Sequence, residues 1–306
     1  MGIEAFILGR LCDAWRGGAC FARTATLGRQ NLSLCERELE SILANVGRSR
    51  AELGEGMLPW TGIADDLLTR LLEIEELLSI DASGYEGASL VHDLNQPVPE
   101  SLWGQFDAVI DGGTLEHVFN FPTAIVSCMR MLKIGGRFYS LTPANNHCGH
   151  GFYQFSPELF FRLFHGANGF DLETLLLVEH PYPGIELSTR RGVWTVKDPA
   201  VAQSRGGLVN RHPVYLFVQA VKRQNVEPLA LVPQQSDYKV AWNASTHVPS
   251  SEDVSLGESV ARRLWQLHAA LPPALGRTLL GLYQRFYRDT LRNRKHYRRW
   301  NPHEVS

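Results

Sequence analysis

The sequence is poor in cysteine, and its cysteines show no paired spacing. A structural zinc site typically begins with two cysteines a few residues apart. No such pair occurs among the five that are present: Cys12, Cys20, Cys35, Cys128 and Cys148. Their odd number also argues against a disulfide framework. We therefore expect no metal centre and no disulfide-stabilised fold.

Long apolar runs and a strong excess of one charge are also missing. No stretch approaches the 18 or so apolar residues that a transmembrane helix needs. The short run from Ala5 to Leu8, next to Glu4, makes a poor signal peptide. The formal net charge of −2 gives no global case for a nucleic-acid partner. We expect a cytoplasmic protein without a membrane span.

The chain has enough apolar residues for one substantial core and an appendage. It contains 306 residues, of which 44% are hydrophobic. The positions of proline, glycine and polar stretches predict four segments. These are an N-terminal extension or short helix over 1–20, an α/β domain over 21–223, a linker over 224–255 and a basic helical region over 256–306.

Three apolar runs end in an aspartate, and they carry most of the functional information. Buried parallel strands appear as continuous apolar runs, and an open α/β sheet binds its ligands at the carboxyl ends of its strands. The three predicted strands are Leu77–Ile80 before Asp81, Ala88–His92 before Asp93, and Phe106–Ile110 before Asp111. The pattern predicts a nucleoside ligand at the carboxyl edge.

The rest of the α/β domain follows a regular order of elements. The sequence predicts a helix from a Ser33–Glu36 capping box to Asn45, ended by Gly47. A helix that closes over Met131–Gly136 is followed by a strand over Arg137–Leu141. The last two strands are expected at Phe170–Val178 and at Val214–Val221, the latter antiparallel.

These motifs together resemble the class I S-adenosylmethionine-dependent methyltransferases over about residues 23–222. The resemblance is carried by Asp81, Asp93-Leu94, Phe106-Asp107, Glu116-His117-Val118 and Leu132-Lys133-Ile134-Gly135-Gly136. The last two motifs are similar to the ubiquinone and sugar methyltransferase branch. The resemblance implies a Rossmann-like α/β sheet with helices on both faces, S-adenosyl-L-methionine as cofactor, and methyl transfer to an oxygen or nitrogen of a small molecule. It suggests a sugar, a glycan precursor or a specialised metabolite as acceptor.

The same resemblance assigns cofactor contacts. Asp81, followed by Ala82 and Ser83, is expected to bind the ribose hydroxyls, and Asp93 with Leu94 is expected beside the adenine. The turn Asp111-Gly112-Gly113 has small residues that would let the cofactor pass close. Each aspartate also has a plainer interpretation as a turn or helix cap.

The first loop departs from the family's glycine-rich pattern. It reads Gly28-Arg29-Gln30, so only the first glycine position is filled. Like charges about 4 Å apart repel by roughly 4 kcal/mol at an effective dielectric constant near 20. Arg29 therefore does not point at the cofactor's sulfonium. It pairs with the cofactor's carboxylate, faces an anionic substrate or braces the protein.

A polar and aromatic loop over 142–157 supplies the candidate catalytic groups. Histidine suits proton removal from an acceptor because its ordinary pKa is near 6.5. We expect His150 to take this role, with His117 as the alternative, His147 as a further candidate and Tyr153 in the same loop. A purely structural loop is the competing interpretation.

The C-terminal region has a strong local charge. From Arg262 to Arg299 there are ten lysines and arginines against one acid, Asp289. Leu275, Leu279, Leu282 and Phe286 follow helical spacing. The region is expected to dock on the body of the protein, on a second copy or on a partner protein. An anionic substrate is an alternative.

Two other functions remain open at this stage. One is a non-catalytic subunit that keeps the methyltransferase fold and acts with a partner. The other is a nucleotide-dependent enzyme of another class, in which Arg29 would face a phosphate.

Overall fold

The computed structural model describes residues 2–53, 62–180, 192–238 and 271–302. The chain divides into two compact units. The first comprises Met1–Val193 and His212–Pro233, and the second comprises Trp194–Arg211 and Gln234–Ser306. The first of the two expected C-terminal helices and most of the expected linker lie outside the described residues.

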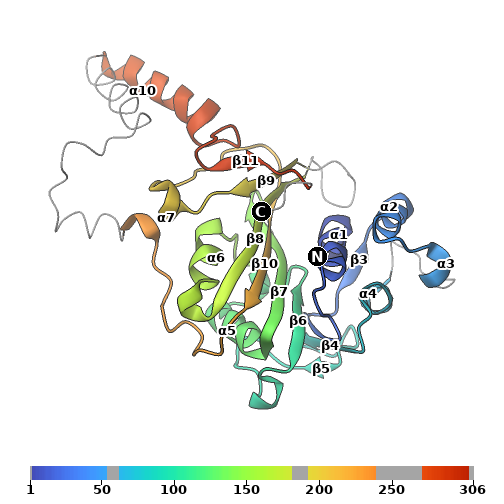
Figure 1. Ribbon diagram of the computed structural model, residues 1–306. Helices are drawn as coiled ribbons and strands as arrows, with labels where there is room; N and C mark the ends of the chain where they lie inside the picture. The colour runs from blue at the N-terminus through green and yellow to red at the C-terminus, as the bar shows by residue number, and fades with distance from the viewer. Residues whose placement is uncertain (1, 54–61, 181–191, 239–270, 303–306) are drawn as a thin grey trace. The chain divides into compact units, whose positions relative to one another are not determined.

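The first unit is built on a mixed sheet (Figure 1). Its strands lie in the order β8-β10-β7-β6-β2-β4-β5. The five strands from β7 to β5 run parallel, and β10 lies antiparallel between β7 and β8. The α/β fold class expected from the sequence, including the antiparallel strand, is thereby confirmed. The strand bounds are β2 Arg23–Leu27, β4 Glu76–Asp81, β5 Leu90–Val91, β6 Phe106–Asp111, β7 Leu132–Asn145, β8 Phe170–Glu179 and β10 Val214–Lys222.

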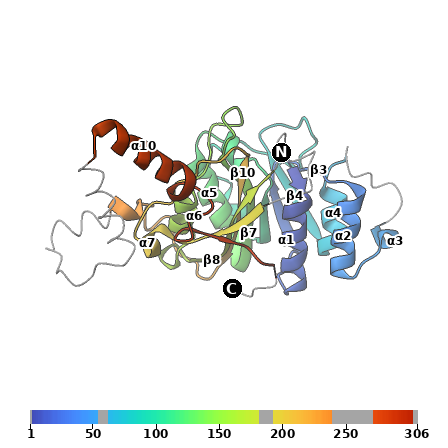
Figure 2. The same cartoon turned by 90° about the horizontal axis from the view of Figure 1, so that it is seen from above.

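Helices cover both faces of this sheet (Figure 2). Successive residues of a strand point to opposite faces, and β7 illustrates this. Tyr139 stacks on Phe21, which precedes β2, whereas Phe138 packs on Phe164 at the end of α6. The helix bounds are α1 Ala5–Arg16, α2 Glu36–Val46, α3 Arg50–Leu53, α4 Asp65–Leu72, α5 Phe121–Met131 and α6 Pro157–Leu163, with one-turn 3-10 helices η1 Glu100–Leu102, η2 Leu115–His117 and η3 Gly166–Asn168.

The N-terminal segment packs into the first unit. Residues Gly2–Glu4 form β1, which pairs in parallel with β3 (Asn31–Ser33). The Glu4 carboxylate accepts hydrogen bonds from the first backbone N–H groups of α1. Ile3 and Ile7 are fully buried. The segment expected as an extension or short helix is therefore a strand and a helix with a share of the core.

Two local predictions were wrong in their bounds. Ser33 lies in β3, and the capping box of α2 is formed by Cys35 and Glu38. The helix α5 ends at Met131, and β7 starts at Leu132. Gly136 belongs to that strand, where an added Cβ would lie 2.9 Å from the backbone oxygen of Phe106. Its glycine is thus required by the close approach of two strands.

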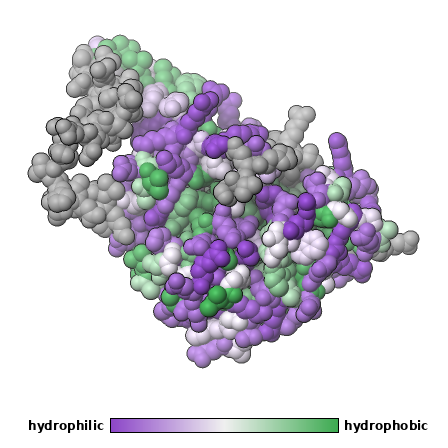
Figure 3. Space-filling view, in the orientation of Figure 1, coloured by the Kyte–Doolittle hydropathy of each residue, from purple (hydrophilic) through white to green (hydrophobic). Residues whose placement is uncertain are grey.

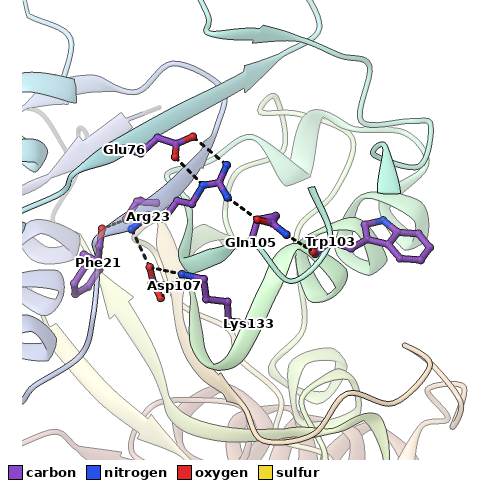
Figure 4. Close-up of polar contacts among 8 residues, drawn as sticks. Phe21, Arg23, Glu76, Trp103, Gln105, Asp107 and Lys133 are labelled. Atoms are coloured by element: carbon purple, nitrogen blue, oxygen red, sulfur yellow. Dashed lines mark hydrogen bonds and ion pairs between the residues drawn. The ribbon is translucent and has the colours of Figure 1, made fainter. Parts of the chain in front are cut away.

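The amino ends of the parallel strands are joined by a network of charged and polar groups, which we call the amino-edge clamp (Figure 4). The Asp107 carboxylate accepts a hydrogen bond from the backbone N–H of Arg23 and pairs with Lys133 at 2.9 Å. The Arg23 guanidinium pairs with Glu76 at 2.8 Å and donates to Gln105. The clamp links the starts of β2, β4, β6 and β7, at the edge away from the predicted ligand site.

The second unit contains a short antiparallel pairing and a helix. Strand β9 (Gly192–Val196) pairs with β11 (Tyr297–Arg299), and Arg299 lies over the Trp194 ring. The helices are α7 (Pro199–Ala202) and α10 (Pro273–Tyr283), followed by a π-helical turn over Gln284–Arg288. Hydrophobic side chains gather on α10 (Figure 3). About half of the surface is exposed in Leu275, Leu279 and Leu282 of this helix and in Phe286 of the π-helical turn. Among the residues described, no helix has the length and hydropathy of a membrane span.

Candidate active site

The predicted ligand groups lie at the carboxyl edge of the sheet. Strands β2, β4, β5, β6 and β7 run parallel, so their carboxyl ends meet on one side. Gly28 follows β2, Asp81 ends β4 and Asp111 ends β6. The loop that carries His147 and His150 follows β7. Residues far apart in the sequence are thus gathered at one edge.

The first group at this edge is built around Gly28. Its backbone has a φ of +72°, a left-handed conformation that favours glycine. A Cβ placed there would lie 2.9 Å from Oγ1 of Thr114 and 3.6 Å from Oδ2 of Asp81. The Asp81 Oδ1 atom accepts a hydrogen bond from the N–H of Ser83 at 3.1 Å. The other carboxylate oxygen therefore lies beside the glycine turn, where a ribose hydroxyl could donate to it.

Gln30 occupies the space between the first loop and the turn after β6. Its amide nitrogen donates to the backbone oxygen of Leu27, and its side-chain oxygen is buried without a hydrogen-bond partner. A Cβ on Gly112 would clash with that oxygen and would lie 3.2 Å from the backbone carbon of Gly2. Gly112 is therefore needed because three segments converge here. Gln30 leaves one unpaired acceptor at the point of convergence.

Arg29 turns away from this group. Its guanidinium pairs with Asp65, at the start of α4, with an N–O distance of 3.0 Å. It also donates to the backbone oxygen of Glu86 at 2.5 Å. A Cβ on Gly87, which has a φ of +76°, would lie 2.7 Å from the same guanidinium. Of the three roles considered for Arg29, these contacts correspond to bracing, here between α4 and the turn over 84–87.

The Asp111 carboxylate is hydrogen-bonded by groups of the chain itself. It is fully buried, and its Oδ2 accepts a hydrogen bond from the Ser140 hydroxyl at 2.7 Å. Its Oδ1 accepts three backbone hydrogen bonds, from Gly113, Thr114 and Leu115. The side chain that was expected near the cofactor thus shapes the turn and caps η2. Gly113, with a φ of +101°, completes that turn.

The predicted adenine contacts, Asp93 and Leu94, and the residues that follow Asp81, Ala82 and Ser83, differ in their exposure. Asp93 is exposed, and its Oδ1 accepts two hydrogen bonds from Asn95, one from the backbone and one from the side chain. These bonds lower the pKa of Asp93. Leu94 is buried, whereas Ala82 and Ser83 are exposed in the turn after β4. The ligand contacts assigned to these four residues stay predictions.

The second group at the edge is formed by one carboxylate and two imidazoles. Glu116, in η2, is fully buried, and neither of its carboxylate oxygens has a hydrogen-bond partner among the described residues. Its Oε1 lies 3.4 Å from Nε2 of His150 and 3.9 Å from Nε2 of His117. The two imidazole rings lie 4.9 Å apart between centroids. We call Glu116, His117 and His150 the Glu-His cluster.

Electrostatics in the Glu-His cluster favour neutral groups. Burial raises the pKa of the Glu116 carboxyl to about 8, and the nearby Asp111 charge adds to this rise. Burial also raises the pKa of Asp111, and its four hydrogen bonds, from Ser140, Thr114, Leu115 and Gly113, oppose that rise. Burial lowers the pKa of both His117 and His150. Burial also lowers the pKa of His147 to about 4.

The loop after β7 is fastened to Glu116. The backbone N–H groups of Phe152 and Tyr153 donate to the Glu116 carbonyl oxygen at 2.7 and 3.2 Å. Gly151 has a φ of +69°, and a Cβ there would lie 2.8 Å from the same oxygen. The Tyr153 hydroxyl donates to the backbone oxygen of Phe119 at 2.6 Å. This contact gives Tyr153 a structural role; its catalytic role stays a prediction.

An aromatic pair lies on the surface beside this loop. The rings of Phe119 and Phe152 are 5.9 Å apart in an edge-to-face arrangement. About 70% of each side chain is exposed: Phe119 71% and Phe152 67%. Two exposed phenylalanines next to the Glu-His cluster offer an apolar contact to a bound molecule.

Two functional features were missed or undervalued in the sequence. Thr114 was not singled out, although its hydroxyl donates to the Leu27 backbone oxygen at 2.6 Å and thereby fixes the Gly28 turn. A threonine three residues after a strand-end aspartate is typical of a side-chain-capped turn, and that signal was present. In the sequence, Glu116 stands out only as part of the Glu116-His117-Val118 motif, and no local pattern predicts its complete burial.

Comparison with known proteins returned no matching family model and no matching curated protein. Solved structures that resemble the chain include a 1,6-didemethyltoxoflavin-N1-methyltransferase from Burkholderia thailandensis with bound S-adenosylhomocysteine. It is 12% identical, with 71% of this chain and 79% of that chain covered and a TM-score of 0.37. A putative methyltransferase from Bacillus halodurans is 11% identical, covering 70% and 99%, with a TM-score of 0.38. The [4+2]-cyclase SpnF is 15% identical, covering 70% and 80%, with a TM-score of 0.35. These values assign no activity to the chain.

Proposed function

We propose that the chain binds S-adenosyl-L-methionine at its carboxyl edge and transfers the methyl group to an oxygen or nitrogen of a small molecule. The observation that carries the proposal is the position of Asp81. Its carboxylate ends β4 with one oxygen beside the left-handed turn at Gly28. A carboxylate at this place suits the two ribose hydroxyls, since each is a donor that needs an acceptor.

The remaining groups fit the cofactor in part. The orphaned Oε1 of Gln30 is a buried acceptor, and the cofactor's ammonium group is a donor that would satisfy it. Arg29 is held by Asp65 and by the backbone of Glu86, so its charge is directed away from the sulfonium. Both features support the fit although the usual glycine-rich loop is absent.

When bound, S-adenosylmethionine would supply a methyl group from its sulfonium sulfur, and the rest of the cofactor would become a neutral thioether. The chain's own groups then have to orient the acceptor, exclude water and accept a proton from a hydroxyl acceptor. His150, with His117 as the alternative, is proposed to take that proton because both imidazoles are neutral at pH 7. The exposed rings of Phe119 and Phe152 support an acceptor with an apolar or ring-shaped face.

The proposal is tested by isothermal titration calorimetry with S-adenosylmethionine, S-adenosylhomocysteine and a panel of nucleoside di- and triphosphates. We expect one site per chain for the first two ligands. Binding of nucleotides alone would instead support a nucleotide-dependent enzyme. An absence of any binding would support a non-catalytic subunit that acts with a partner.

Sugars, glycan precursors and specialised metabolites remain the proposed acceptor classes. A second copy or a partner protein remains the proposed occupant of the C-terminal region, whose exposed hydrophobic side chains lie on α10.

A further inference from the structure

We infer that the Glu-His cluster is a binding site for a divalent first-row transition-metal ion. Glu116, His117 and His150 each offer one ligand atom, and these three atoms lie within 4.8 Å of one another. No metal centre was expected from the sequence, because that expectation rested on the spacing of cysteines alone. The cluster joins η2 to a loop that follows a different strand.

The spacing of the three atoms suits a common ion. Two ligand atoms on a tetrahedral ion with bonds near 2.1 Å lie about 3.4 Å apart. Oε1 of Glu116 lies at 3.4 Å from one imidazole nitrogen and at 3.9 Å from the other. Small rotations of the partly exposed His117 ring would bring the second pair into the same range. Three protein ligands leave at least one coordination position open.

The hydrogen bonding in the cluster gives the second, independent reason. Glu116 is fully buried, and within the part of the chain that the structure describes neither carboxylate oxygen has a hydrogen-bond partner. Nε2 of His150 also lacks one, although it faces Oε1 at 3.4 Å. A buried carboxylate without partners is costly, and such groups are normally paired or bound to a metal. Three atoms that converge without hydrogen-bonding to each other are expected where an ion lies between them.

The ligand set indicates the class of ion. Two imidazoles and one carboxylate suit zinc, manganese, iron or cobalt, whereas magnesium and calcium prefer sets made wholly of oxygen. Imidazole binds a metal through a ring nitrogen. His147 lies outside the triad, with its ring centroid 6.1 Å from that of His150.

An ion at this site would have a defined effect on the reaction, and this part of the inference rests on the proposed function. A hydroxyl bound at the open position loses its proton more readily, because a cation lowers the pKa of a bound oxygen. The proton leaves to solvent, the oxygen–carbon bond to the methyl group forms, and the carbon–sulfur bond breaks with its electron pair on sulfur. His150 would then act as a ligand in place of a proton acceptor.

The test begins with chelator-treated full-length protein. Calorimetric titration with Mn²⁺, Co²⁺ and Zn²⁺ is expected to give one site per chain in the wild type. Removing a residue that hydrogen-bonds to a metal ligand costs roughly 10- to 100-fold in metal affinity. Glu116→Gln and His150→Gln change the ligands themselves, so each should lose more than this. Circular dichroism checks that both variants fold, and Glu116→Gln preserves the side chain's shape.

Two control variants make the result specific. His165→Gln changes an exposed histidine at η3 and should leave ion affinity unchanged. Cys148→Ser removes an exposed thiol close in sequence to the cluster and should also leave it unchanged. Loss of binding in Cys148→Ser alone, equal affinity in Glu116→Gln and wild type, or no wild-type binding at micromolar ion would each overturn the inference. S-adenosylmethionine is titrated into the same ion-free protein, so failure of the cofactor proposal is detected separately.

Discussion

Nε2 of His150 lies 3.4 Å from Oε1 of Glu116, and neither atom has a hydrogen-bond partner in residues 2–53, 62–180, 192–238 and 271–302. The two residues are brought together because the loop after β7 is bonded to the Glu116 carbonyl through Phe152 and Tyr153. One residue therefore both fastens the loop and presents a carboxylate to the histidine that the loop carries. This arrangement connects the candidate chemistry to the turn after β6.

Replacing His150 with glutamine is expected to reduce the rate of methyl transfer without weakening the binding of the cofactor. Loss of a group that removes a proton costs roughly a hundred- to ten-thousandfold in rate. Single-turnover measurements report this rate, and titration with S-adenosylmethionine reports affinity. The exposed His165→Gln variant should behave like wild type in both assays. An unchanged rate in His150→Gln would remove this histidine from the chemistry.

Removal of the Asp81 carboxylate should weaken S-adenosylmethionine and S-adenosylhomocysteine equally. A hydrogen bond to a charged group is worth roughly 1.5–3 kcal/mol, so Asp81→Ala should bind about ten- to a hundredfold more weakly. Asp171→Ala serves as the control because that exposed residue starts β8, at the opposite edge. Equal affinities for wild type and Asp81→Ala, with intact circular dichroism, would place Asp81 outside the pocket.

Arg29 and Asp65 should act as one unit in cofactor binding. If the pair braces the turn over 84–87, Arg29→Ala, Asp65→Ala and the double variant should weaken cofactor binding by the same factor, since residues in contact are not additive. If Arg29 instead binds the cofactor's carboxylate, Asp65→Ala should leave affinity intact or improve it. Titration of the three variants separates the two roles, and we expect the first result.

Asp107→Ala should destabilise the fold while sparing the ligand site. The carboxylate loses the backbone N–H of Arg23 and the Lys133 ammonium, and hydrogen bonds of this kind are worth roughly 1.5–3 kcal/mol each at most. We expect the free energy of unfolding in urea to fall by about 1–3 kcal/mol. Asp171→Ala breaks the exposed pair with Arg223 and should change it by less than about 1 kcal/mol. A loss of cofactor affinity in Asp107→Ala, measured at a temperature where the variant is folded, would show that the clamp also affects the ligand site.

Cys12 should make stability depend on alkaline pH. Burial raises the pKa of this thiol in α1 to about 12, from an ordinary value near 9. The folded state keeps the proton while the unfolded chain releases it. The contribution of Cys12 to the free energy of unfolding is therefore unchanged below about pH 9 and decreases as the pH rises toward 12. At pH 10.5 the loss is about 2 kcal/mol.

The Cys12→Ala variant provides the comparison for this effect. Urea unfolding of both proteins from pH 8 to 10.5 should give a steeper decline for the wild type. Other buried acids such as Tyr139 are present in both proteins and cancel in the difference. Parallel curves would show that the Cys12 thiol is not buried as described.

The sheet was predictable from the sequence because its strands carry their own signals. In β6, the consecutive residues Ala108, Val109 and Ile110 are apolar and fully buried, as both faces of a central parallel strand require. Because an open α/β sheet binds its ligands at the carboxyl ends of its strands, the aspartates at these ends could also be predicted as site residues. Helix limits were less secure: nothing local distinguishes Leu132, which pairs with Phe106, from a further turn of α5.

The site was predictable only as a set of positions. Asp81 and Gly28 were each identified, but their approach depends on the pairing of β2 with β4. The ion pair between Arg29 and Asp65 could not be predicted, because ion pairs between residues far apart in the chain leave no periodic pattern. Gln30 likewise appeared as a lost glycine, whereas its burial against Gly112 explains the residue through packing.

The amino-edge clamp separates the residues that anchor the strands from the loop proposed to recognise the acceptor, and protein engineers can use this separation. Arg23, Glu76, Asp107 and Lys133 anchor the strands at one edge, whereas acceptor recognition is proposed in a loop that leaves the other edge after β7. The segment 146–156 could therefore be exchanged as a cassette for loops of other sequence. Provided that the two bonds to the Glu116 carbonyl are kept, such grafts should alter selectivity while the scaffold retains its thermal tolerance.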